Sequence, residues 1–359
     1  MIFTLGGALP LDEAGGTALF AFGLRRLRTG YTGNVLQVRN SVGAIGNLAF
    51  DSNDEVSTLS NVNITTAGGS FTSGSNHTLA AFANSADVTV RTWYDQSGGG
   101  RNITQSTVAN QPFLMQAGLF RLVDGKPSVY FPYSLRRLNY VGNCADYYNL
   151  VNNLGSTTIV KYASTSTAFT SNQISIWGIT NFTTDSSPVS NCASNQAFYS
   201  FGIPNNQTGT TGTIGFASRT IPNVVETCDG VTYPTCASHP IIGIGTTISN
   251  TIAHNGAGGR IYSFADSNVA RNLKTYINGT LDFTRGYQCD LTRFPLINVS
   301  GSSTFFIGNV NTSALPLTGG GTDIDYSFQE FIAYDGTNYH FERNLIERNM
   351  GRYYNITVS

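Results

Sequence analysis

The stretch Arg91-Thr-Trp-Tyr-Asp-Gln-Ser-Gly98 joins two signals that indicate a β protein. Residues 88–94 alternate between apolar and polar types, which is the pattern of a strand with one buried face. The run ends at Asp95 and Ser97, whose short side chains bond nearby backbone groups and fix a turn. We predict this turn role for Asp95 and regard proton transfer as the less favoured alternative. The residues expected to mark the fold are Trp93, Tyr94, Asp95, Gln96, Ser97 and Gly98.

Outward from this stretch, short runs of β-branched and aromatic residues recur along the chain between polar, glycine-containing turns. Asn278-Gly279 separates two such runs, and this dipeptide favours a two-residue hairpin. Many short strands with polar turns indicate an all-β antiparallel β-sandwich, or jelly roll. The predicted strands are 35–39, 88–94, 128–131, 158–162, 174–179, 197–201, 213–217, 259–264, 273–277, 280–283, 304–307 and 327–334.

A short N-terminal helix is predicted over residues 17–28, with an apolar stripe along one side. Three arginines lie mostly opposite that stripe. So few basic residues on a short helix favour a solvated or ion-paired face over a nucleic-acid patch. The stripe consists of Leu19, Phe20, Leu24 and Leu27, and the arginines are Arg25, Arg26 and Arg28.

A C-terminal helix is predicted over residues 339–351, with Phe341 and Leu345 on one face and Ile346 at its edge. No linker divides the chain and no repeat of fixed period is present, so we expect a single sandwich domain over residues 1–359. The polar, cysteine-containing stretch 181–256 is interpreted as long loop insertions at one end of it.

Composition excludes several classes of function. Of 359 residues, 40% are apolar and 12% aromatic, which allows a sizeable core, whereas only 11% are charged. Charged residues make up roughly 25% of typical globular chains, so hydrogen-bonding uncharged residues supply most of the polarity here. The net charge of −1 argues against nucleic acid or an anionic membrane as a partner, because both require a basic face. No stretch is apolar enough for membrane insertion.

The N-terminus lacks the basic and apolar regions of a signal peptide. A secreted-looking surface without that signal favours a virion protein, with a secreted, extracellular protein as the alternative.

Because the number of cysteines is five, at least one thiol has no partner within the chain, and both a Cys228–Cys236 disulfide and free thiols are compatible with the sequence. Nine Asn-x-Ser/Thr sequons are present, for which we favour no glycosylation unless a virus supplies the machinery. The sequons begin at Asn63, Asn76, Asn102, Asn181, Asn206, Asn278, Asn298, Asn311 and Asn355.

Three N-terminal segments, 24–40, 92–105 and 124–131, resemble the opening of the fungal α-L-arabinofuranosidase B catalytic domain, and similar modules occur in phage and algal-virus proteins. The hairpin 274–281 and the run 328–334 with its following helix resemble laminin-G and concanavalin-like sandwiches generally. The resemblance implies a concanavalin-like sandwich and leaves residues 140–255 uncovered.

The arabinofuranosidase family that these segments resemble has its nucleophilic Glu in a Cys-Cys-Phe-Asp-Tyr-Gly-Asn-Ala-Glu run. The similar stretch here, 174–182, lacks both the cysteines and the Glu. The position of the family's acid/base Asp is occupied by Asn311, and an amide cannot exchange a proton at neutral pH. We therefore expect no catalytic residue. The histidines lack metal-ligand spacing, so neither a metal nor a cofactor is expected.

The leading hypothesis is a non-enzymatic virion surface or structural protein, such as a capsid decoration, fibre or attachment component. Its expected partners are other virion or assembly proteins in an oligomer, and a host-surface glycan. The alternatives are an arabinofuranosidase-type glycoside hydrolase, for which Asp323 and Asp325 are a candidate carboxylate pair, and a cellular lectin-like adhesin. The residues that we assign to carbohydrate binding are Trp177, Tyr199, Asn311 and Asp323.

Overall fold

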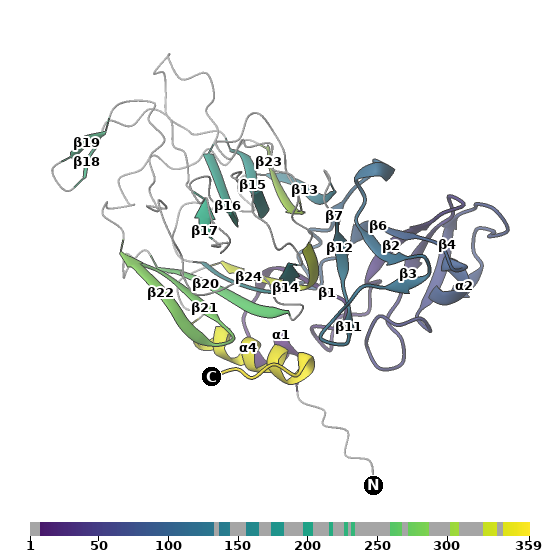
Figure 1. Cartoon of the computed structure of the whole chain (residues 1–359), viewed down its shortest axis with the longest axis horizontal. Helices are drawn as coiled ribbons and strands as arrows, with labels where there is room; N and C mark the ends of the chain where they lie inside the picture. Colours follow the sequence, from purple (N-terminus) through teal and green to yellow (C-terminus); the bar gives the residue numbers. More distant parts are fainter. Residues whose placement is uncertain are drawn as a thin grey trace, which may run out of the picture.

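The computed structural model consists mainly of antiparallel strands in packed layers with few helices (Figure 1), which confirms the predicted all-β sandwich. No helix in the described part of the chain has the length and apolarity needed to cross a membrane. The structure describes residues 8–132, 136–143, 156–164, 174–182, 197–203, 215–217, 226–228, 231–233, 259–267, 272–286, 302–308, 326–335 and 340–359.

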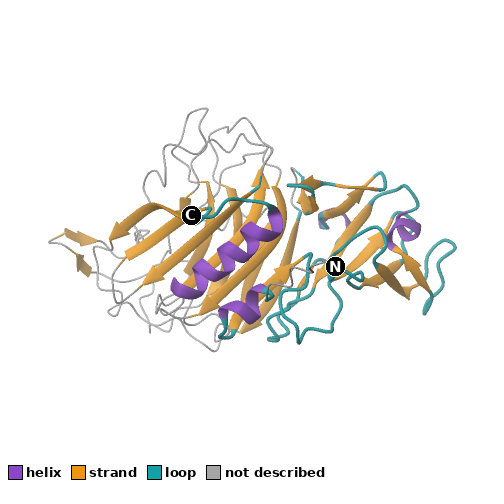
Figure 2. Ribbon diagram, turned by 90° about the horizontal axis from the view of Figure 1, so that it is seen from below, coloured by secondary structure: helices purple, strands orange, loops and turns teal. Residues whose placement is uncertain are grey.

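The lower layer is a sheet in the order β22-β21-β20-β14-β24-β1, antiparallel throughout. Figure 2 shows helix α4 lying across the outer face of this sheet, with helix α1 beside it. The elements are α1 (Pro10–Ala14), β1 (Ala18–Gly23), β14 (Ser156–Ser164), β20 (Arg260–Ser267), β21 (Asn272–Ile277), β22 (Thr280–Gly286), β24 (Tyr326–Asp335) and α4 (His340–Tyr354).

The upper layer is a second antiparallel sheet in the order β17-β16-β15-β23-β13. A separate hairpin, β18–β19, lies within the stretch predicted as loops. Most of 181–256 lies outside the described residues, so the predicted loop insertions stay a prediction. The strands are β13 (Arg137–Asn143), β15 (Ile174–Phe182), β16 (Ala197–Ile203), β17 (Gly215–Ala217), β18 (Glu226–Cys228), β19 (Val231–Tyr233) and β23 (Ser302–Gly308).

Residues 35–120 build an N-terminal lobe beside the two layers (Figure 1). Its sheet runs β5-β4-β3-β2-β6 and joins the upper layer through β7 and the lower layer through β8 and β12. The elements of the lobe are β2 (Leu36–Asn40), β3 (Ile45–Leu48), β4 (Asn61–Thr66), β5 (Asn76–Thr78), α2 (Leu79–Ala83), β6 (Val88–Trp93), β7 (Ile103–Thr104), a 3-10 turn η1 (Val108–Asn110), β8 (Phe113–Gln116) and β9 (Leu119–Phe120). They are followed by β10 (Leu122–Val123), β11 (Lys126–Pro127) and β12 (Val129–Phe131).

One continuous apolar core runs through the lobe and between the layers. At its centre the rings of Phe20 and Phe305 stack with centroids 4.3 Å apart, and Phe22 lies 6.0 Å from Trp93. A second, smaller cluster lies under α4 on the outer face of the lower layer. Strands of the lower layer are therefore buried on both faces.

The predicted helix over 17–28 is wrong, because residues Ala18–Gly23 form strand β1. All six residues of this strand are buried. Phe20 and Phe22 face the core between the layers, while Ala18 and Ala21 face the cluster under α4. A surface helix needs one polar side, whereas an unbroken apolar run suits a strand covered on both faces. The short N-terminal helix does occur, but earlier, as α1.

The C-terminal helix is confirmed, although its inward face differs from the prediction. Ile346, Met350 and Tyr354 are buried against the lower layer, and Leu345 is only half-buried. Nothing is described of the Phe341 side chain. The prediction chose the wrong side because the buried face is not purely apolar, since Arg343 and Glu347 are buried on it as well.

The hairpin at Asn278-Gly279 is confirmed, with φ angles of 48° and 84°. The end of the chain closes over it, since the Ser359 N–H donates to the Asn278 carbonyl (3.1 Å). A Cβ atom at position 279 would lie 2.6 Å from a Val358 methyl group, so glycine suits both the turn and this close approach.

The core assignment of β1 predicts a large effect of one substitution. Phe22→Ala should lower the free energy of unfolding by about 3–5 kcal/mol, because it removes a fully buried ring from between the layers. Leu281→Ala, at a half-exposed strand position, should change it by about 0.5 kcal/mol or less. Urea denaturation measures both, and equal effects would contradict this placement of β1.

Candidate functional site

Gln96 is fully buried and bonds to the backbone of β1 and the residues that follow it. Its own N–H donates to the Ala21 carbonyl (2.7 Å), and its side-chain oxygen accepts from the Leu27 N–H (2.8 Å). Its Nε2 donates to the carbonyls of Gly23 and Arg25, both at 3.1 Å. Among the described strands β1 pairs only with β24, so Gln96 satisfies groups on the other side that a neighbouring strand would otherwise bind.

Asp95 organises the turn that delivers Gln96. Its carboxylate accepts hydrogen bonds from the Ala21 N–H (3.0 Å), the Ser97 N–H (2.9 Å), the Ser97 hydroxyl (2.7 Å) and the Arg101 N–H (3.1 Å). Its own N–H donates to Asn102 (2.9 Å). Four donors around a buried carboxylate fix the backbone and leave little room for a substrate group.

Replacing this carboxylate by an amide should therefore destabilise the fold. Asp95→Asn turns an NH₂ group toward N–H donors, and we expect a loss of about 3 kcal/mol in unfolding free energy. Asp54→Asn, at a more exposed carboxylate, is the matched control and should change it little. Wild-type stability for Asp95→Asn in urea denaturation would show that the carboxylate does not hold the turn.

Tyr31 lies close to this turn, and its hydroxyl donates to the Asn34 carbonyl (2.6 Å). Burial raises the pKa of Tyr31 to about 12, and the nearby Asp95 and Tyr94 raise it further in the same direction. Because the folded pKa exceeds the value of about 10 for an unfolded tyrosine, the folded protein binds this proton more tightly.

The stability that Tyr31 contributes through this proton should be complete below pH 10 and lost as the pH rises toward 12. Tyr31→Phe should therefore lose less stability than the wild type between these two pH values. Urea denaturation at several alkaline pH values, with tyrosinate absorbance near 295 nm as a second readout, checks this. If the unfolding free energies of the two proteins changed with pH in parallel, Tyr31 would not have a raised pKa in the folded protein.

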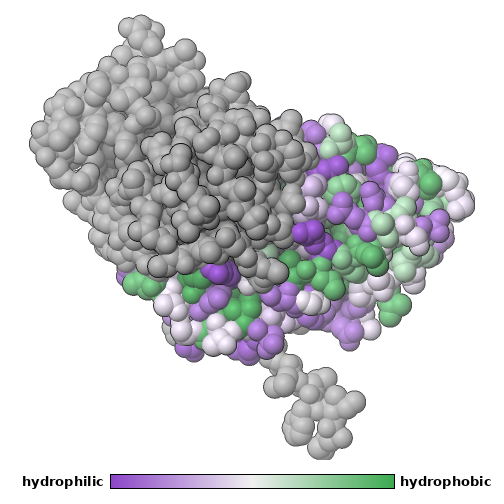
Figure 3. All heavy atoms as spheres, in the orientation of Figure 1, coloured by the Kyte–Doolittle hydropathy of each residue, from purple (hydrophilic) through white to green (hydrophobic). Residues whose placement is uncertain are grey.

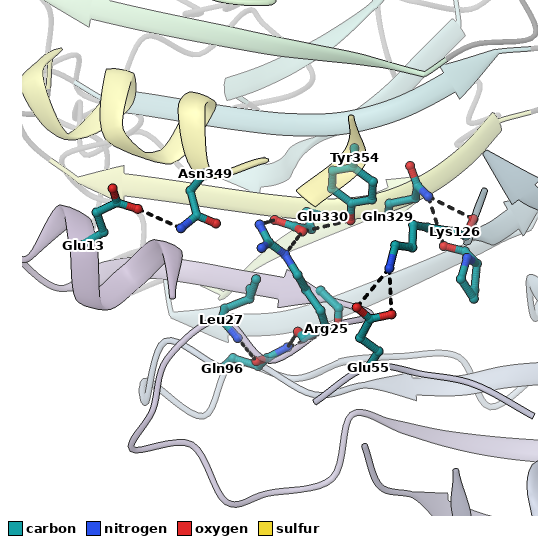
Figure 4. A network of polar contacts seen from close by, with 12 residues as sticks. Glu13, Arg25, Leu27, Glu55, Gln96, Lys126, Gln329, Glu330, Asn349 and Tyr354 are labelled. Carbon is teal, nitrogen blue, oxygen red and sulfur yellow. Dashed lines mark hydrogen bonds and ion pairs between the residues drawn. The ribbon is translucent and has the colours of Figure 1, made fainter. Parts of the chain in front are cut away.

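A cluster of ionisable side chains, here called the charged junction, lies where the lower layer, α4 and the β10–β11 hairpin meet (Figure 4). Arg25 pairs with Glu330 (2.5 Å), and the Tyr354 hydroxyl donates to the same carboxylate (2.8 Å). Lys126 pairs with Glu55 (2.9 Å) and Lys161 with Asp124 (2.7 Å). The junction consists of Arg25, Glu55, Asp124, Lys126, Lys161, Glu330, Tyr353 and Tyr354.

A β-bulge in β24 places two consecutive polar residues on this outer face. Lys161 pairs with Glu330 and Tyr162 with Phe328, so Gln329 is the extra residue in the ladder. Its side-chain nitrogen donates to three carbonyls of the β10–β11 hairpin, including that of Val123 (2.9 Å). Without the bulge, either Gln329 or Glu330 would point into the apolar core.

The charges of the junction hold one another in place. Burial by itself would lower the pKa of Arg25, but Glu330 beside it raises that pKa above its ordinary value. Burial lowers the pKa of Lys161, and Asp124 opposes this shift. Burial, followed by the charge of Glu330, holds the pKa of Tyr354 well above its ordinary value. The Arg25 guanidinium also lies 4.1 Å from the ring centre of Tyr353.

This arrangement suits structure better than catalysis. Glu330 is fully buried, and Arg25 and Tyr354 already occupy its oxygens. Asp124 and Glu55 each hold a lysine. A general acid or base must reach the substrate, which Glu330 cannot do from this position. In the part of the chain that the structure describes, no group of three or more metal-ligating side chains occurs.

Breaking the junction from one side should be costly. Glu330→Leu leaves the Arg25 charge buried without a partner, and we expect a loss of about 3–5 kcal/mol in unfolding free energy. Arg25→Met combined with Glu330→Leu should recover part of that loss, because neither charge is then left alone. Urea denaturation of Arg25→Met, of Glu330→Leu and of the double variant gives the coupling energy between the two side chains. A coupling energy near zero would show that the two charges do not stabilise each other.

An accessible polar site lies instead on the outer face of the N-terminal lobe. Gln37, Asn47, Asn63 and Asn76, here called the amide row, occupy directly paired positions on β2, β3, β4 and β5. Neighbouring strands lie about 4.8 Å apart, so the four side chains span roughly 14 Å. The opposite face of these strands belongs to the core, which directs the amide row outward.

Hydrogen bonds order the amide row. Gln37 donates to Asn47 (3.0 Å), and the Tyr94 hydroxyl donates to the same Asn47 oxygen (3.0 Å). Asn63 donates to Asn76 (3.1 Å), and Arg91 donates to the Gln37 oxygen (3.1 Å). These bonds hold the side chains at half-exposed positions, or at an exposed one in the case of Asn76.

Three groups of the amide row remain open. Within the described residues, Asn47 Nδ2, Asn63 Oδ1 and Asn76 Nδ2 have no hydrogen-bond partner. The row therefore presents donors and an acceptor to an uncharged polar ligand.

The residues assigned to carbohydrate binding from the sequence are not brought into this site. Trp177 and Tyr199 lie on the paired strands β15 and β16 of the upper layer, and their side chains are not described. Asn311 and Asp323 lie outside the described residues. The amide row was missed because its members are separated by ten to sixteen residues and match no motif. Polar outward positions in alternating strands were the only signal.

No protein-family model matches the chain, and no curated protein matches it in sequence. Among solved structures, it is similar to an arabinofuranosidase complexed with arabinofuranosyl-α-1,2-xylobiose, at 13% identity and a TM-score of 0.47, over 95% of this chain and 64% of that one. An α-L-arabinofuranosidase soaked with a cyclic sulfate inhibitor gives 11% identity and a TM-score of 0.44 over the same shares. The chain thus spans 64% of the length of these structures.

A third similar structure is the botulinum neurotoxin serotype D ligand-binding domain in complex with N-acetylneuraminic acid. It has 12% identity and a TM-score of 0.38, over 71% of this chain and 48% of that one. The structural neighbours are thus β-sandwich domains of arabinofuranosidases and neurotoxin binding domains.

Proposed function

We propose that this chain is a non-enzymatic carbohydrate-binding sandwich that belongs to an outer assembly, such as the surface of a virion. The observation that carries the binding part is the amide row. Four uncharged side chains lie in register on an open sheet face, and three of their groups are free to bond a ligand.

The chemistry of the row matches that of sugar hydroxyl groups. A hydroxyl donates one hydrogen bond and accepts two, and an amide offers both functions. Neutral partners avoid the large cost of stripping water from a charge. A row of amides across successive strands therefore suits an extended, uncharged glycan that lies across the strands.

The non-enzymatic part rests on the carboxylates. Glycoside hydrolysis usually needs two carboxyl groups on either side of the scissile bond. The amide row contains none. In the charged junction, Glu330 is buried and paired with Arg25, and Asp124 and Glu55 each form an ion pair with a lysine. Hydrolysis of the arabinofuranosidase type is the alternative, for which Asp323 and Asp325 are the candidate carboxylates.

The place in a virion assembly rests on composition. Few charges and many uncharged hydrogen-bonding residues are typical of exposed sandwich proteins. On the face shown in Figure 3, hydrophilic and hydrophobic residues are interspersed over the described lobe. Glycan attachment by such a component fits this surface.

Glycan binding is tested with the bacterially expressed chain, since a glycan on Asn63 or Asn76 would cover the row. Soluble arabinoxylan should retard the protein in affinity electrophoresis. Asn47→Ala combined with Asn63→Ala should weaken this binding at least tenfold, because about two hydrogen bonds are lost. Asn53→Ala, an exposed amide outside the row, is the matched control and should bind as the wild type does.

Two outcomes would overturn the proposal. One is the absence of binding both to arabinoxylan and to a glycan array of neutral and acidic sugars. The other is turnover of 4-nitrophenyl α-L-arabinofuranoside that disappears in Asp323→Asn, which would make the protein an enzyme.

A further inference from the structure

A cavity lies at the β8–β9 hairpin and is lined by none of the residues of the amide row. Its volume is about 370 Å³, within the usual range for small-ligand sites. Its lining comes from β8, β9, β10 and the end of β14. The lining residues are Gln116, Leu119, Phe120, Arg121, Leu122, Val123 and Ala163.

Two tight hairpins build the walls of this cavity. In the first, Ala117 and Gly118 form the turn, and the Gly118 N–H donates to the Ala86 carbonyl (2.9 Å). A Cβ atom at position 118 would lie 2.6 Å from the Ser85 Cα, so the hairpin is fixed against the lobe. In the second, Asp124 lies at the turn after β10 with a φ of 49°.

The charged junction fixes the second wall. The Asp124 carboxylate binds Lys161 (2.7 Å) and accepts from the Gly259 N–H (3.0 Å). Gln329 holds the carbonyl of Val123, which lines the cavity. A preformed wall loses little entropy when a ligand binds. The buried charges thus act on the cavity by holding its backbone, and their carboxylates are already paired.

Arg121 is the one charged residue of the lining. Its guanidinium lies 4.4 Å from the ring centre of Tyr130, and the Arg121 carbonyl accepts from the Ser128 hydroxyl (2.7 Å). Within the described part of the chain, no carboxylate pairs with Arg121, and its side chain is half-exposed. A guanidinium held over a ring keeps its planar donors available for a carboxylate.

We propose that this cavity binds the carboxylate of an acidic sugar. Arg121 pairs with the carboxylate in a bidentate manner, and Gln116 forms a hydrogen bond with a hydroxyl group of the sugar. The apolar side of the sugar ring contacts Leu119 and Leu122. These leucines are 72% and 57% exposed, which leaves them open to a ligand. The sugar part of this assignment rests on the proposed function, whereas the carboxylate part rests on Arg121.

The test uses isothermal titration calorimetry with D-glucuronic acid and N-acetylneuraminic acid, and with D-glucose as the neutral match of glucuronic acid. At least one acid should bind and glucose should not. Arg121→Met keeps a side chain of similar length beside Tyr130 but removes the charge, and should weaken binding at least tenfold. Arg121→Lys should bind more weakly than the wild type, because an ammonium cannot pair in a bidentate manner.

Arg348→Met, at an exposed arginine of α4, is the matched control and should bind as the wild type does. Equal binding of glucose and glucuronic acid, or full binding by Arg121→Met, would overturn the proposal. Binding of benzoate but of neither acidic sugar would also overturn it, since the cavity would then recognise a carboxylate without the sugar. Loss of acid binding with arabinoxylan binding intact would leave the proposed function standing.

Discussion

The free edge of β1 is the constraint on which the rest of the structure depends. This strand lies between two apolar clusters and pairs with β24 alone among the described strands. Unpaired backbone groups inside a protein are costly. Asp95 and Gln96 form hydrogen bonds, through their side chains and the Gln96 backbone N–H, with the backbone groups of β1 and of the residues after it. The turn after β6 thereby connects the N-terminal lobe to the lower layer, in addition to the strand pairings through β8 and β12.

The charged junction connects the lower layer to α4 and to the β10–β11 hairpin, and its cost is the loss of water from buried charges. Burying Arg25 and Glu330 requires both to lose water, and their attraction repays this only when the geometry is good. The Gln329 bulge supplies that geometry, because it lets two successive polar side chains leave the same face of β24. A pairing slipped by one residue would put Glu330 among phenylalanines. We infer that the junction selects one register of β24 against β14 and β1.

Much of the fold could be predicted from local patterns, because strands buried on one face alternate visibly. The alternation in 88–94 and the Asn278-Gly279 turn are examples. Prediction failed where both faces are covered. Residues 18–23 show no alternation, and the spacing of the apolar residues, with arginines mostly opposite, was read as a helical stripe. The consecutive Gln329 and Glu330 gave no signal, since a bulge depends on the partner strand and not on the segment itself.

The candidate site was beyond prediction for a related reason. The amide row exists only after four strands pair in register, and Gln37 and Asn76 lie 39 positions apart in the sequence. Sequence reasoning searched instead for aromatic residues and carboxylates near loops, as at Trp177 and Asp323. Spacing along the chain identifies sites on one helix or one loop, whereas a site across strands requires the register of each pair.

The placement of charge unites these observations. Arg25, Lys161, Glu330 and Glu347 are almost wholly buried, while uncharged amides occupy the open face of the lobe. In most proteins charged side chains are rarely fully buried unless they are paired. Because several of the chain's few charges lie in the interior, the open face of the lobe offers uncharged hydrogen-bonding groups to a ligand. Such bonds are weakly screened by salt, unlike charge pairs at a surface. Arg121 adds a cation to this picture, since it is half-exposed in a preformed cavity and has no ion-pair partner among the described residues.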